Sequence, residues 1–493
     1  MQPDKRRAAF ELSPEEFRQI GHGLVDQLAD FLERLPSLPV TPGESPAEVK
    51  QVIASERSLP ESGRDPLPLA REAAELLMAH SLFNGHPRFF GYVTSSPAPI
   101  GVFGDLIAAM INSNVGAWNL APAATEIEAQ TVRWIAELMG YPADCGGLLV
   151  SGGNMANFVG FLAGRAAKAG QQVRTAGVRA LDKPLRCYCS AGTHTWIQKA
   201  ADMSGLGTDA IRWVACDSRQ RIDLEALRAQ VERDRNDGEH PFLVAGTAGS
   251  VSTGAVDPLD ELAAYCREED LWFHVDGAYG GLAAAVPGTP AELRGIALAD
   301  SVAVDPHKWL YTALEAGCVL VRSPQHLRDA FSYHPPYYSF DTEAINYFDV
   351  GPQNSRGFRA LKIWLAFQQA GRAGCVQAMA DDIALSEYAF RLFAEHPNFE
   401  AVTQGLSICT FRYVPAALRA GVGSEETEAA LNRLNQELLN RIETSGELFV
   451  SNAVMDGKFL LRMCIVNFRT SRKDIEALPG LIARMGAELT VSI

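Results

Sequence analysis

The sequence predicts an α/β protein with a mainly parallel sheet in its middle part and a smaller α+β region after it. Apolar, β-branched segments alternate with helical patterns over about 280 residues, which is typical of repeated βαβ units. Polar residues and glycines follow each of these segments, as in SVAVDPHKWLY (301–311). Beyond about residue 375 the regular alternation stops, which indicates a second domain.

Composition indicates a soluble globular protein of two to four domains, at roughly 100–200 residues each. The chain has 493 residues, of which 47% are hydrophobic and 21% charged. Its net charge of −15 disfavours nucleic acid and anionic membrane as partners. The nine cysteines are scattered, which predicts reduced thiols in a cytoplasmic protein and no metal site. Neither a membrane span nor a secretion signal is expected.

The N-terminal part is predicted to be helical and to wrap around its neighbours. Residues 11–36 carry an amphipathic helical pattern. Ser13 is a plausible N-cap, Pro14 suits the first turn, and Glu16 completes a capping box. A proline-rich stretch follows, which favours an extended linker. We expect residues 1–100 to form a dimer-forming segment of this kind.

The middle region, predicted as a large domain over 101–375, repeats the order strand, loop, helix. Right-handed βαβ units of this kind give a mainly parallel sheet, and ligands then bind at the carboxyl ends of its strands. The predicted strand-and-loop segments are 146–153, 186–194, 241–250, 271–281 and 301–309.

The C-terminal region, 376–493, is predicted as a small α+β domain. Its predicted helices are 376–396, 424–444 and 472–488, and its predicted strands are 406–414, 447–453 and 458–468.

Several residues at the predicted strand ends could each be structural, but together they indicate one chemistry. SGGNMAN (151–157) opens a helix after a strand, which suits a phosphate. Asp276 ends a strongly apolar strand, where a carboxylate needs a partner. Lys308 follows the next strand, and His194 and Thr247 follow two earlier ones. This combination points to pyridoxal phosphate (PLP), which needs a lysine for its aldehyde and a carboxylate for its pyridine nitrogen.

The motifs at these positions resemble those of the group II PLP-dependent amino-acid decarboxylases, the aromatic-L-amino-acid decarboxylase-like family. The resemblance covers most of the chain, and the most specific pair is HVDGAYGG followed by DPHKW. It implies an aspartate-aminotransferase-type (fold type I) fold with a seven-stranded large-domain sheet, assembled as an intertwined homodimer. The matching segments are HPRFFGYV (86–93), WNLAPAATEIE (118–128), SGGNMAN (151–157), GTHTW (192–196), HVDGAYGG (274–281), DPHKW (305–309) and SRGFRALKIW (355–364).

The resemblance also implies roles for individual residues. Lys308 is the Schiff-base lysine and His307 contacts the phosphate. Asp276 pairs with the pyridinium nitrogen, Ala278 packs against the ring, and His194 stacks on its other face and helps to position the substrate. Further implied contacts are Gly153 and Asn154 with the phosphate, Thr247 beside the cofactor, Ser355 reaching the phosphate from the partner subunit, and Tyr92, Val93 and Thr94 on the substrate side.

Two features of the motifs stay open. Residues 331–350 match the family's mobile lid, whose tyrosine protonates the reacting carbon. Tyr338 is the best match for that tyrosine, with Tyr337 as the alternative, because the flanking residues differ. Asp305 stands where animal members of the family carry asparagine, so its role is not assigned.

The predicted function is decarboxylation of an L-amino acid to its amine and CO2, with an aromatic substrate favoured. Val93 replaces the family's aromatic residue, and Arg88 is absent from the animal enzymes, so glutamate, diaminobutyrate and aspartate remain alternatives. An aldehyde synthase of the same fold is a second reading, disfavoured by the lid tyrosine and His194. A non-catalytic dimeric scaffold is a third, which the complete set of catalytic residues opposes.

Overall fold

A computed structural model describes residues 9–333 and 344–490 of the chain. Its first helix, α1 (Pro14–Arg34), begins as predicted. The Ser13 hydroxyl accepts from the Glu16 amide at 3.2 Å, and the Glu16 carboxylate accepts from the Ser13 amide at 2.8 Å. This capping box satisfies two backbone N–H groups that would lack partners at the start of a helix.

The larger sheet has seven strands in the order β1-β7-β6-β5-β4-β2-β3. Only β7 runs antiparallel to its neighbours, so the prediction of a mainly parallel seven-stranded sheet is confirmed. Two of these strands, β3 and β7, were not identified in the sequence. The strands are β1 (Gly146–Val150), β2 (Leu185–Ser190), β3 (Ile211–Val214), β4 (His240–Thr247), β5 (Trp272–Asp276), β6 (Ser301–Val304) and β7 (Gly317–Val321).

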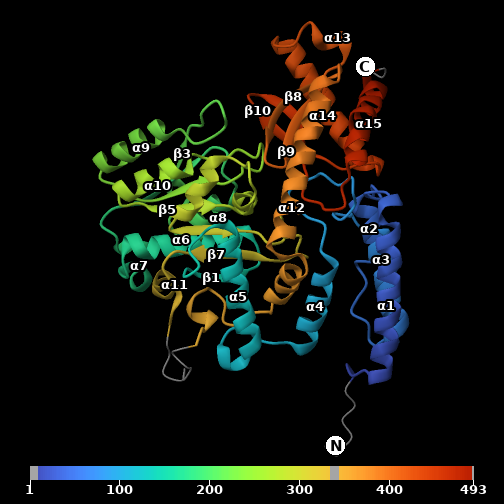
Figure 1. The fold of residues 1–493 in the computed structure, drawn as a ribbon, viewed down its shortest axis with the longest axis horizontal. Helices are drawn as coiled ribbons and strands as arrows, with labels where there is room; N and C mark the ends of the chain where they lie inside the picture. The colour runs from blue at the N-terminus through green and yellow to red at the C-terminus, as the bar shows by residue number, and fades with distance from the viewer. Residues whose placement is uncertain (1–8, 334–343, 491–493) are drawn as a thin grey trace, which may run out of the picture.

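Helices cover both faces of this sheet, which places a hydrophobic core on each side (Figure 1). Neighbouring strand residues point to opposite cores: Leu149 joins one and Leu148 the other. The first core includes α5 (Pro122–Met139), α9 (Leu224–Asn236) and α10 (Leu259–Glu268), and the second includes α6 (Gly153–Ala169), α8 (Trp196–Met203) and α11 (Pro324–Phe331).

A long helix, α12 (Ala360–Glu395), leads from the larger sheet to a smaller antiparallel one. It bends at Gly371, whose φ of 63° lies in the left-handed region that glycine tolerates. The predicted boundary at residue 375 falls within α12, and the division into domains stays a prediction. The smaller sheet has the order β10-β11-β9-β8 and consists of β8 (Phe399–Gly405), β9 (Ile408–Tyr413), β10 (Ser451–Met455) and β11 (Lys458–Cys464), with α13 (Ala416–Arg419), α14 (Glu425–Ser445) and α15 (Arg472–Thr490) around it.

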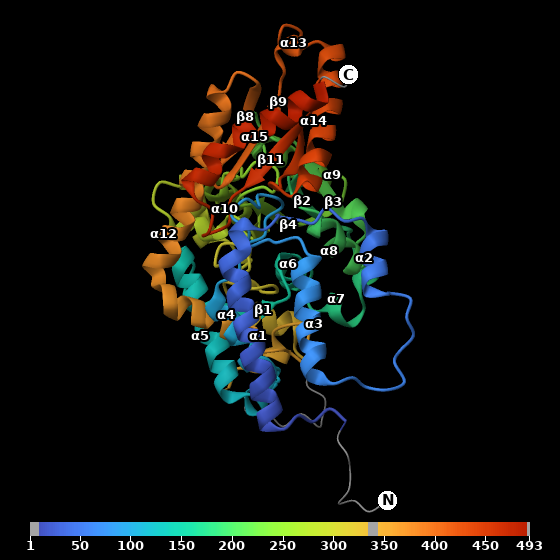
Figure 2. The same cartoon turned by 90° about the vertical axis from the view of Figure 1, so that its right-hand side faces the viewer.

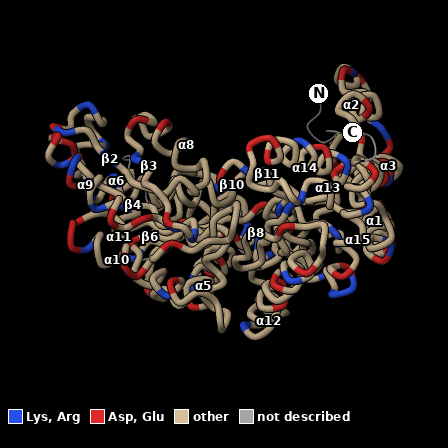
Figure 3. Tube along the Cα trace, turned by 90° about the horizontal axis from the view of Figure 1, so that it is seen from above, with Lys and Arg blue, Asp and Glu red and all other residues tan. Residues whose placement is uncertain are grey.

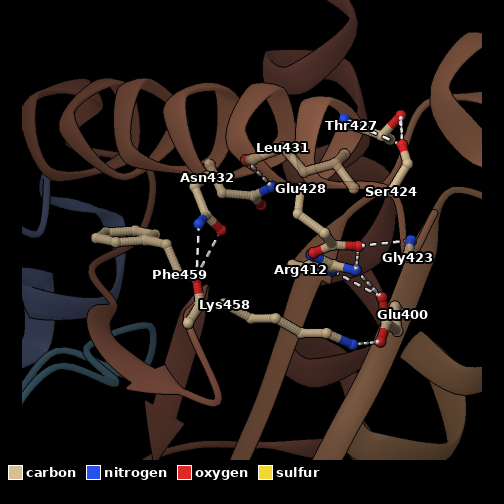
Figure 4. A network of polar contacts seen from close by, with 12 residues as sticks. Glu400, Arg412, Gly423, Ser424, Thr427, Glu428, Leu431, Asn432, Lys458 and Phe459 are labelled. Carbon is tan, nitrogen blue, oxygen red and sulfur yellow. Dashed lines mark hydrogen bonds and ion pairs between the residues drawn. The ribbon is translucent and has the colours of Figure 1, made fainter. Parts of the chain in front are cut away.

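A partly buried ion network ties α14 to three strands of the smaller sheet (Figure 4). The fully buried Arg412 side chain on β9 binds the carboxylates of Glu400 on β8 and Glu428 on α14. Lys458 on β11 binds Glu400 from the other side at 2.8 Å. Because each charge has a partner, the network can sit under the helix without leaving an unpaired charge.

The N-terminal helices lie on the outside of the molecule, and α1 and α3 (Pro66–Ala79) pack side by side (Figure 2). Acidic and basic residues are interspersed over the chain trace (Figure 3). None of the helices within 9–333 and 344–490 is long and apolar enough to cross a membrane. The remaining helices are α2 (Pro46–Ile53), α4 (Pro99–Ile111) and α7 (Gln172–Thr175), with short 3₁₀ turns at Leu35–Ser37, Trp118–Leu120, Val178–Ala180, Thr208–Ala210, Gly281–Ala285, Ala291–Leu298 and Tyr347–Asp349.

Candidate active site

A pocket of about 840 Å³ lies where the carboxyl ends of the parallel strands meet the smaller sheet. Loops after β1, β2, β4, β5 and β6 form one side, and residues of β10 and β11 form the other. This is the position at which open parallel sheets bind ligands. The predicted site residues that line it are Tyr92, Val93, Thr94, Gly153, Asn154, His194, Thr247, Asp276, Ala278, His307 and Lys308.

Two predicted site residues are not placed in this pocket by the described part of the chain. Ser355 lies exposed in the segment before α12 and does not line the pocket of its own chain. Tyr338, like its alternative Tyr337, falls outside the described residues. The predicted roles of both positions therefore stay predictions.

Lys308 is held in a tight loop after β6 by contacts with Asp305. The Lys308 Nζ lies 2.9 Å from the Asp305 Oδ2, and the Lys308 amide donates to the Asp305 carbonyl at 2.9 Å. Asp305 is buried, and its Oδ1 has no hydrogen-bond partner among the described residues. Asp305, which the sequence left without a role, is thus the charge that faces the lysine amine.

His307 has its ring fixed by the backbone. Its Nδ1 lies 2.6 Å from the Ala316 carbonyl oxygen, to which it donates, so Nε2 is the nitrogen left to face Asp305 at 3.6 Å. Burial lowers the pKa of His307, although Asp305 acts in the opposite direction. The ring is therefore neutral near pH 7, and with Nδ1 donating to the carbonyl its Nε2 carries a lone pair.

Asp276 ends β5 with its carboxylate at the pocket and only 7% of the residue exposed. The Ala278 amide donates to its Oδ1 at 3.1 Å. A buried carboxylate in this position needs a cationic or N–H partner from a ligand. The small Ala278 side chain lines the pocket beside it and leaves room for a flat ring.

The first turn of α6 has a geometry suited to an anion. Gly152 precedes the helix and provides no side-chain cap, so the first backbone N–H groups stay free for a ligand. Gly153 is required by close packing, because a Cβ there would lie 2.7 Å from the Asp305 Oδ2 and 2.8 Å from the Ala278 Cβ.

His194 and Thr247 complete the loop side of the pocket. The His194 side chain is open to solvent on one side, yet desolvation by the surrounding protein lowers its pKa, so the ring is neutral near pH 7. The Thr247 hydroxyl is buried and has no hydrogen-bond partner among the described residues. Its unused donor and acceptor are available to a group bound in the pocket.

Arg462 on β11 is a site residue that sequence reasoning missed. Its Nη1 donates to the Tyr92 carbonyl at 3.1 Å and its Nε to the Val251 carbonyl at 2.5 Å. Its buried Nη2 has no partner in the part of the chain that the structure describes, and the side chain lines the pocket. An arginine inside the apolar strand KFLLRMC was the signal that could have identified it.

These features fit PLP. An amine, a buried carboxylate, a neutral imidazole and a helix N-terminus converge on one pocket, and the buried hydroxyl of Thr247 lacks a partner there. The donor set matches the aldehyde, pyridine nitrogen, ring face and phosphate of this cofactor.

Comparison with known proteins agrees with the assignment of PLP to this pocket. Residues 46–414 match the family described as "Pyridoxal-dependent decarboxylase conserved domain". An aromatic-L-amino-acid decarboxylase of Bacillus atrophaeus is 34% identical over 489 residues, covering 98% of each chain. A phenylacetaldehyde synthase of Petunia hybrida is 30% identical and covers 92% of this chain and 91% of its own.

Solved structures confirm the fold. The Oryza sativa TDC structure with PLP and tryptamine superposes with a TM-score of 0.89 at 26% identity, covering 98% of this chain and 100% of that one. The aspartate-aminotransferase-type fold expected from the sequence is thereby confirmed. The chain belongs to the pyridoxal-dependent decarboxylase family and is a PLP-dependent amino-acid decarboxylase.

Proposed function

We propose that the protein converts an aromatic L-amino acid to its amine and CO2, with the pocket residues acting in the roles set out below. The observation that carries the proposal is the convergence of Lys308, Asp276 and His194 on one pocket at the strand ends. The likeness to the Bacillus atrophaeus aromatic-L-amino-acid decarboxylase supports the aromatic substrate.

The cofactor would be held at both ends. Lys308 would bind the aldehyde, and Asp276 would hold a proton on the pyridine nitrogen. His307, Gly153 and Asn154 would contact the phosphate at the start of α6. Ala278 and His194 would lie on opposite faces of the ring, and Thr247 would meet a polar group at its edge. When bound, PLP supplies an acceptor for the electron pair that CO2 leaves behind.

Asp305 would keep the lysine in place. Its Oδ2 lies 2.9 Å from the Lys308 Nζ, so the amine is aimed at the pocket before the cofactor arrives. A charge-assisted contact of this kind is stronger than a neutral hydrogen bond. Lys308 would be released from it when the amine reacts.

The substrate would be bound from the side of the smaller sheet. The free Nη2 of Arg462 is suited to the substrate carboxylate, because a buried guanidinium nitrogen gains most from an anionic partner. Residues 92–94 (Tyr92, Val93 and Thr94) and Val251 line the same pocket and would face the side chain. The carboxylate end and the side-chain end would thus be held by different parts of the chain.

Tyr338 would protonate the reacting carbon, and Ser355 would reach the phosphate of the partner's site in a homodimer. An apolar face of α4 supports the dimer: Phe103, Leu106 and Met110 are exposed in the single chain. Apolar patches of this kind mark interfaces. Sedimentation of the holoenzyme would show a species of twice the chain mass, and a concentration-independent monomer would contradict the dimer.

Cytoplasmic location is proposed on the state of the cysteines. All nine are free thiols, and seven of them are buried. Free buried thiols persist in a reducing compartment. Alkylation of the native and unfolded protein from whole cells would show nine free thiols after unfolding, and a disulfide would contradict this location.

The function is tested by supplying twenty L-amino acids to the holoenzyme and measuring CO2 and amine. We expect the highest kcat/KM with an aromatic substrate, and Lys308→Ala should abolish turnover. Faster release of CO2 from glutamate, diaminobutyrate or aspartate would overturn the substrate assignment. Near-normal turnover by Lys308→Ala would overturn the role of the lysine.

An aldehyde synthase is the second candidate, favoured by the 30% identity to the Petunia hybrida phenylacetaldehyde synthase. The same assay separates the two, because oxidative deamination consumes O2 and releases aldehyde, ammonia and peroxide. Amine in proportion to CO2 supports decarboxylation alone. Aldehyde in proportion to CO2, with peroxide, would support the alternative.

A further inference from the structure

The Asp382 carboxylate on α12 lies buried outside the pocket lining, and it contacts the loop that carries Lys308, residues 305–312. Only 2% of Asp382 is exposed. Its Oδ2 accepts from the Tyr311 hydroxyl at 2.7 Å. Tyr311 comes three residues after Lys308, so a helix that does not line the pocket holds the loop that presents the lysine.

Two further donors face the same carboxylate. The Asn467 amide, just after β11, donates to Oδ1 at 3.4 Å. The buried Trp309 indole N–H has no hydrogen-bond partner among the described residues, and it favours the charged form of Asp382. A carboxylate can accept from all three donors, whereas a carboxylic acid or an amide would turn a donor of its own toward one of them.

The backbone of Tyr311 has a strained conformation, so relaxed packing alone does not account for the hydrogen bond between Tyr311 and Asp382. Its φ is 50°, in the left-handed region that non-glycine residues adopt rarely and at a cost. Its carbonyl accepts from the Ala98 amide at 2.7 Å, and its amide donates to the Lys308 carbonyl at 3.1 Å. The strained residue is thus fixed at its backbone and at its side chain, and Asp382 supplies the side-chain contact.

We propose that Asp382 is a positioning residue that holds the lysine loop, residues 305–312, through Tyr311 and Trp309. It also joins that loop to the segment after β11, because Asn467 contacts Asp382 and donates from its side chain to the His86 carbonyl at 2.8 Å. The inference rests on the proposed role of Lys308 in binding the cofactor.

The charge of Asp382 opposes folding while it supports the loop. Burial raises the pKa of Asp382 from its ordinary 3.8 to about 7. Asp381 raises this pKa too, and the contacts with Tyr311, Asn467 and Trp309 lower it. Two other titratable groups lie near this pair of residues: the Cys375 thiol near Tyr311 and the Cys464 thiol near Asp382. The folded chain therefore binds a proton between pH 4 and 7, and stability falls as the pH rises through this range.

The decisive experiment combines loop mobility with thermal stability in three variants of the holoenzyme at pH 8. Asp382→Asn removes the charge, Tyr311→Phe removes only the hydroxyl, and Asp381→Asn is the matched control at an exposed neighbouring carboxylate. Hydrogen exchange of the 308–312 amides and the rate of cofactor release report the loop. The unfolding midpoint reports the whole fold.

We expect Asp382→Asn to speed amide exchange and cofactor release about fivefold, the difference between a charged and a neutral hydrogen bond. Tyr311→Phe removes that hydrogen bond and should speed both by at least as much. Their unfolding midpoints should move in opposite directions: upward for Asp382→Asn, which removes a buried charge, and downward for Tyr311→Phe, which leaves it less solvated. At pH 6 the effect of Asp382→Asn on exchange should shrink, because the wild-type carboxyl is then mostly protonated. Asp381→Asn should match the wild type at pH 8, where the Asp382 carboxylate is charged in both proteins.

Wild-type exchange and cofactor release in Asp382→Asn at pH 8 would overturn the proposal, as would an effect that is equal at pH 6 and pH 8. A purely structural role would lower the midpoints of both variants together. Failure of the Lys308 assignment is recognised separately, because Lys308→Ala would then keep the cofactor spectrum of the wild type. The exchange of the 308–312 amides does not depend on that assignment.

Discussion

Arg356 and Glu128 form an ion pair that is almost completely buried between α5 and the segment before α12. The Arg356 guanidinium also donates to the carbonyls of Leu149 at 2.7 Å and Val115 at 2.9 Å. The Glu128 carboxylate accepts from the Leu149 amide at 2.9 Å. The pair therefore joins β1 to the segment that carries Ser355.

Removal of one partner of this pair should be strongly destabilising. Arg356→Met leaves the Glu128 carboxylate unpaired in the interior, and we expect the free energy of unfolding to fall by about 3–5 kcal/mol. Urea denaturation measures the change. The matched control is Arg484→Met, which breaks an exposed pair with Glu447 and should cost less than about 1 kcal/mol. Equal losses in the two variants would contradict this account.

The network around Arg412 makes stability depend on pH at the acidic end. Hydrogen bonds from Arg412 lower the pKa of Glu428 from 4.5 to about 2. A lowered pKa stabilises the fold above about pH 4.5, and this contribution is lost as the pH falls toward 2. The shift corresponds to about 3 kcal/mol, of which we expect roughly half after solvent screening.

The measurement is the unfolding midpoint between pH 7 and pH 3 for the wild type and Glu428→Gln. At pH 7 the unfolding midpoint of the wild type should lie above that of Glu428→Gln, and this difference should shrink as the pH falls. Glu426→Gln changes an exposed carboxylate in the first turn of the same helix and serves as the control. A constant difference between wild type and Glu428→Gln across the range would refute the assignment.

Asp305→Asn should weaken the orientation of Lys308. Asparagine keeps the shape but replaces a charged contact at 2.9 Å with a neutral one. The difference between the two kinds of hydrogen bond predicts a fall in kcat/KM of about tenfold. The absorbance band of the bound cofactor should also change its pH dependence. The fall in kcat/KM should be larger for Asp305→Ala than for Asp305→Asn. Equal kcat/KM in the wild type and both variants would show that Asp305 does not orient Lys308.

Arg462→Met should weaken substrate binding through the carboxylate. Loss of a charged hydrogen bond predicts a rise in KM of about tenfold or more. The amine product lacks a carboxylate, so its inhibition constant separates two roles of Arg462. An unchanged inhibition constant supports carboxylate binding. Equal weakening of substrate and amine would show that Arg462 acts only by holding the Tyr92 and Val251 carbonyls.

The parts of the fold that local patterns describe were predictable. The capping box of Ser13 and Glu16 is present, and the helices predicted at 424–444 and 472–488 correspond to α14 and α15. Strand β8 was not predicted, because its sequence FEAVTQG has one buried residue and a weak apolar pattern. Helix α12 begins at Ala360 rather than near 376. Glycines at 371 and 374 interrupt its helical pattern, and the chain bends at Gly371 before the predicted part of the helix.

The sequence by itself determined five of the seven strands of the larger sheet, and with them the placement of Asp276 and Lys308 at one edge of that sheet. Parallel strands bring their carboxyl ends together whatever the loops between them contain. Only the tertiary structure decided that Arg462 lines the pocket and that Asp382 lies behind Lys308. Contacts between residues so far apart depend on how α12 and the smaller sheet pack against the larger one, and no local periodicity carries that information.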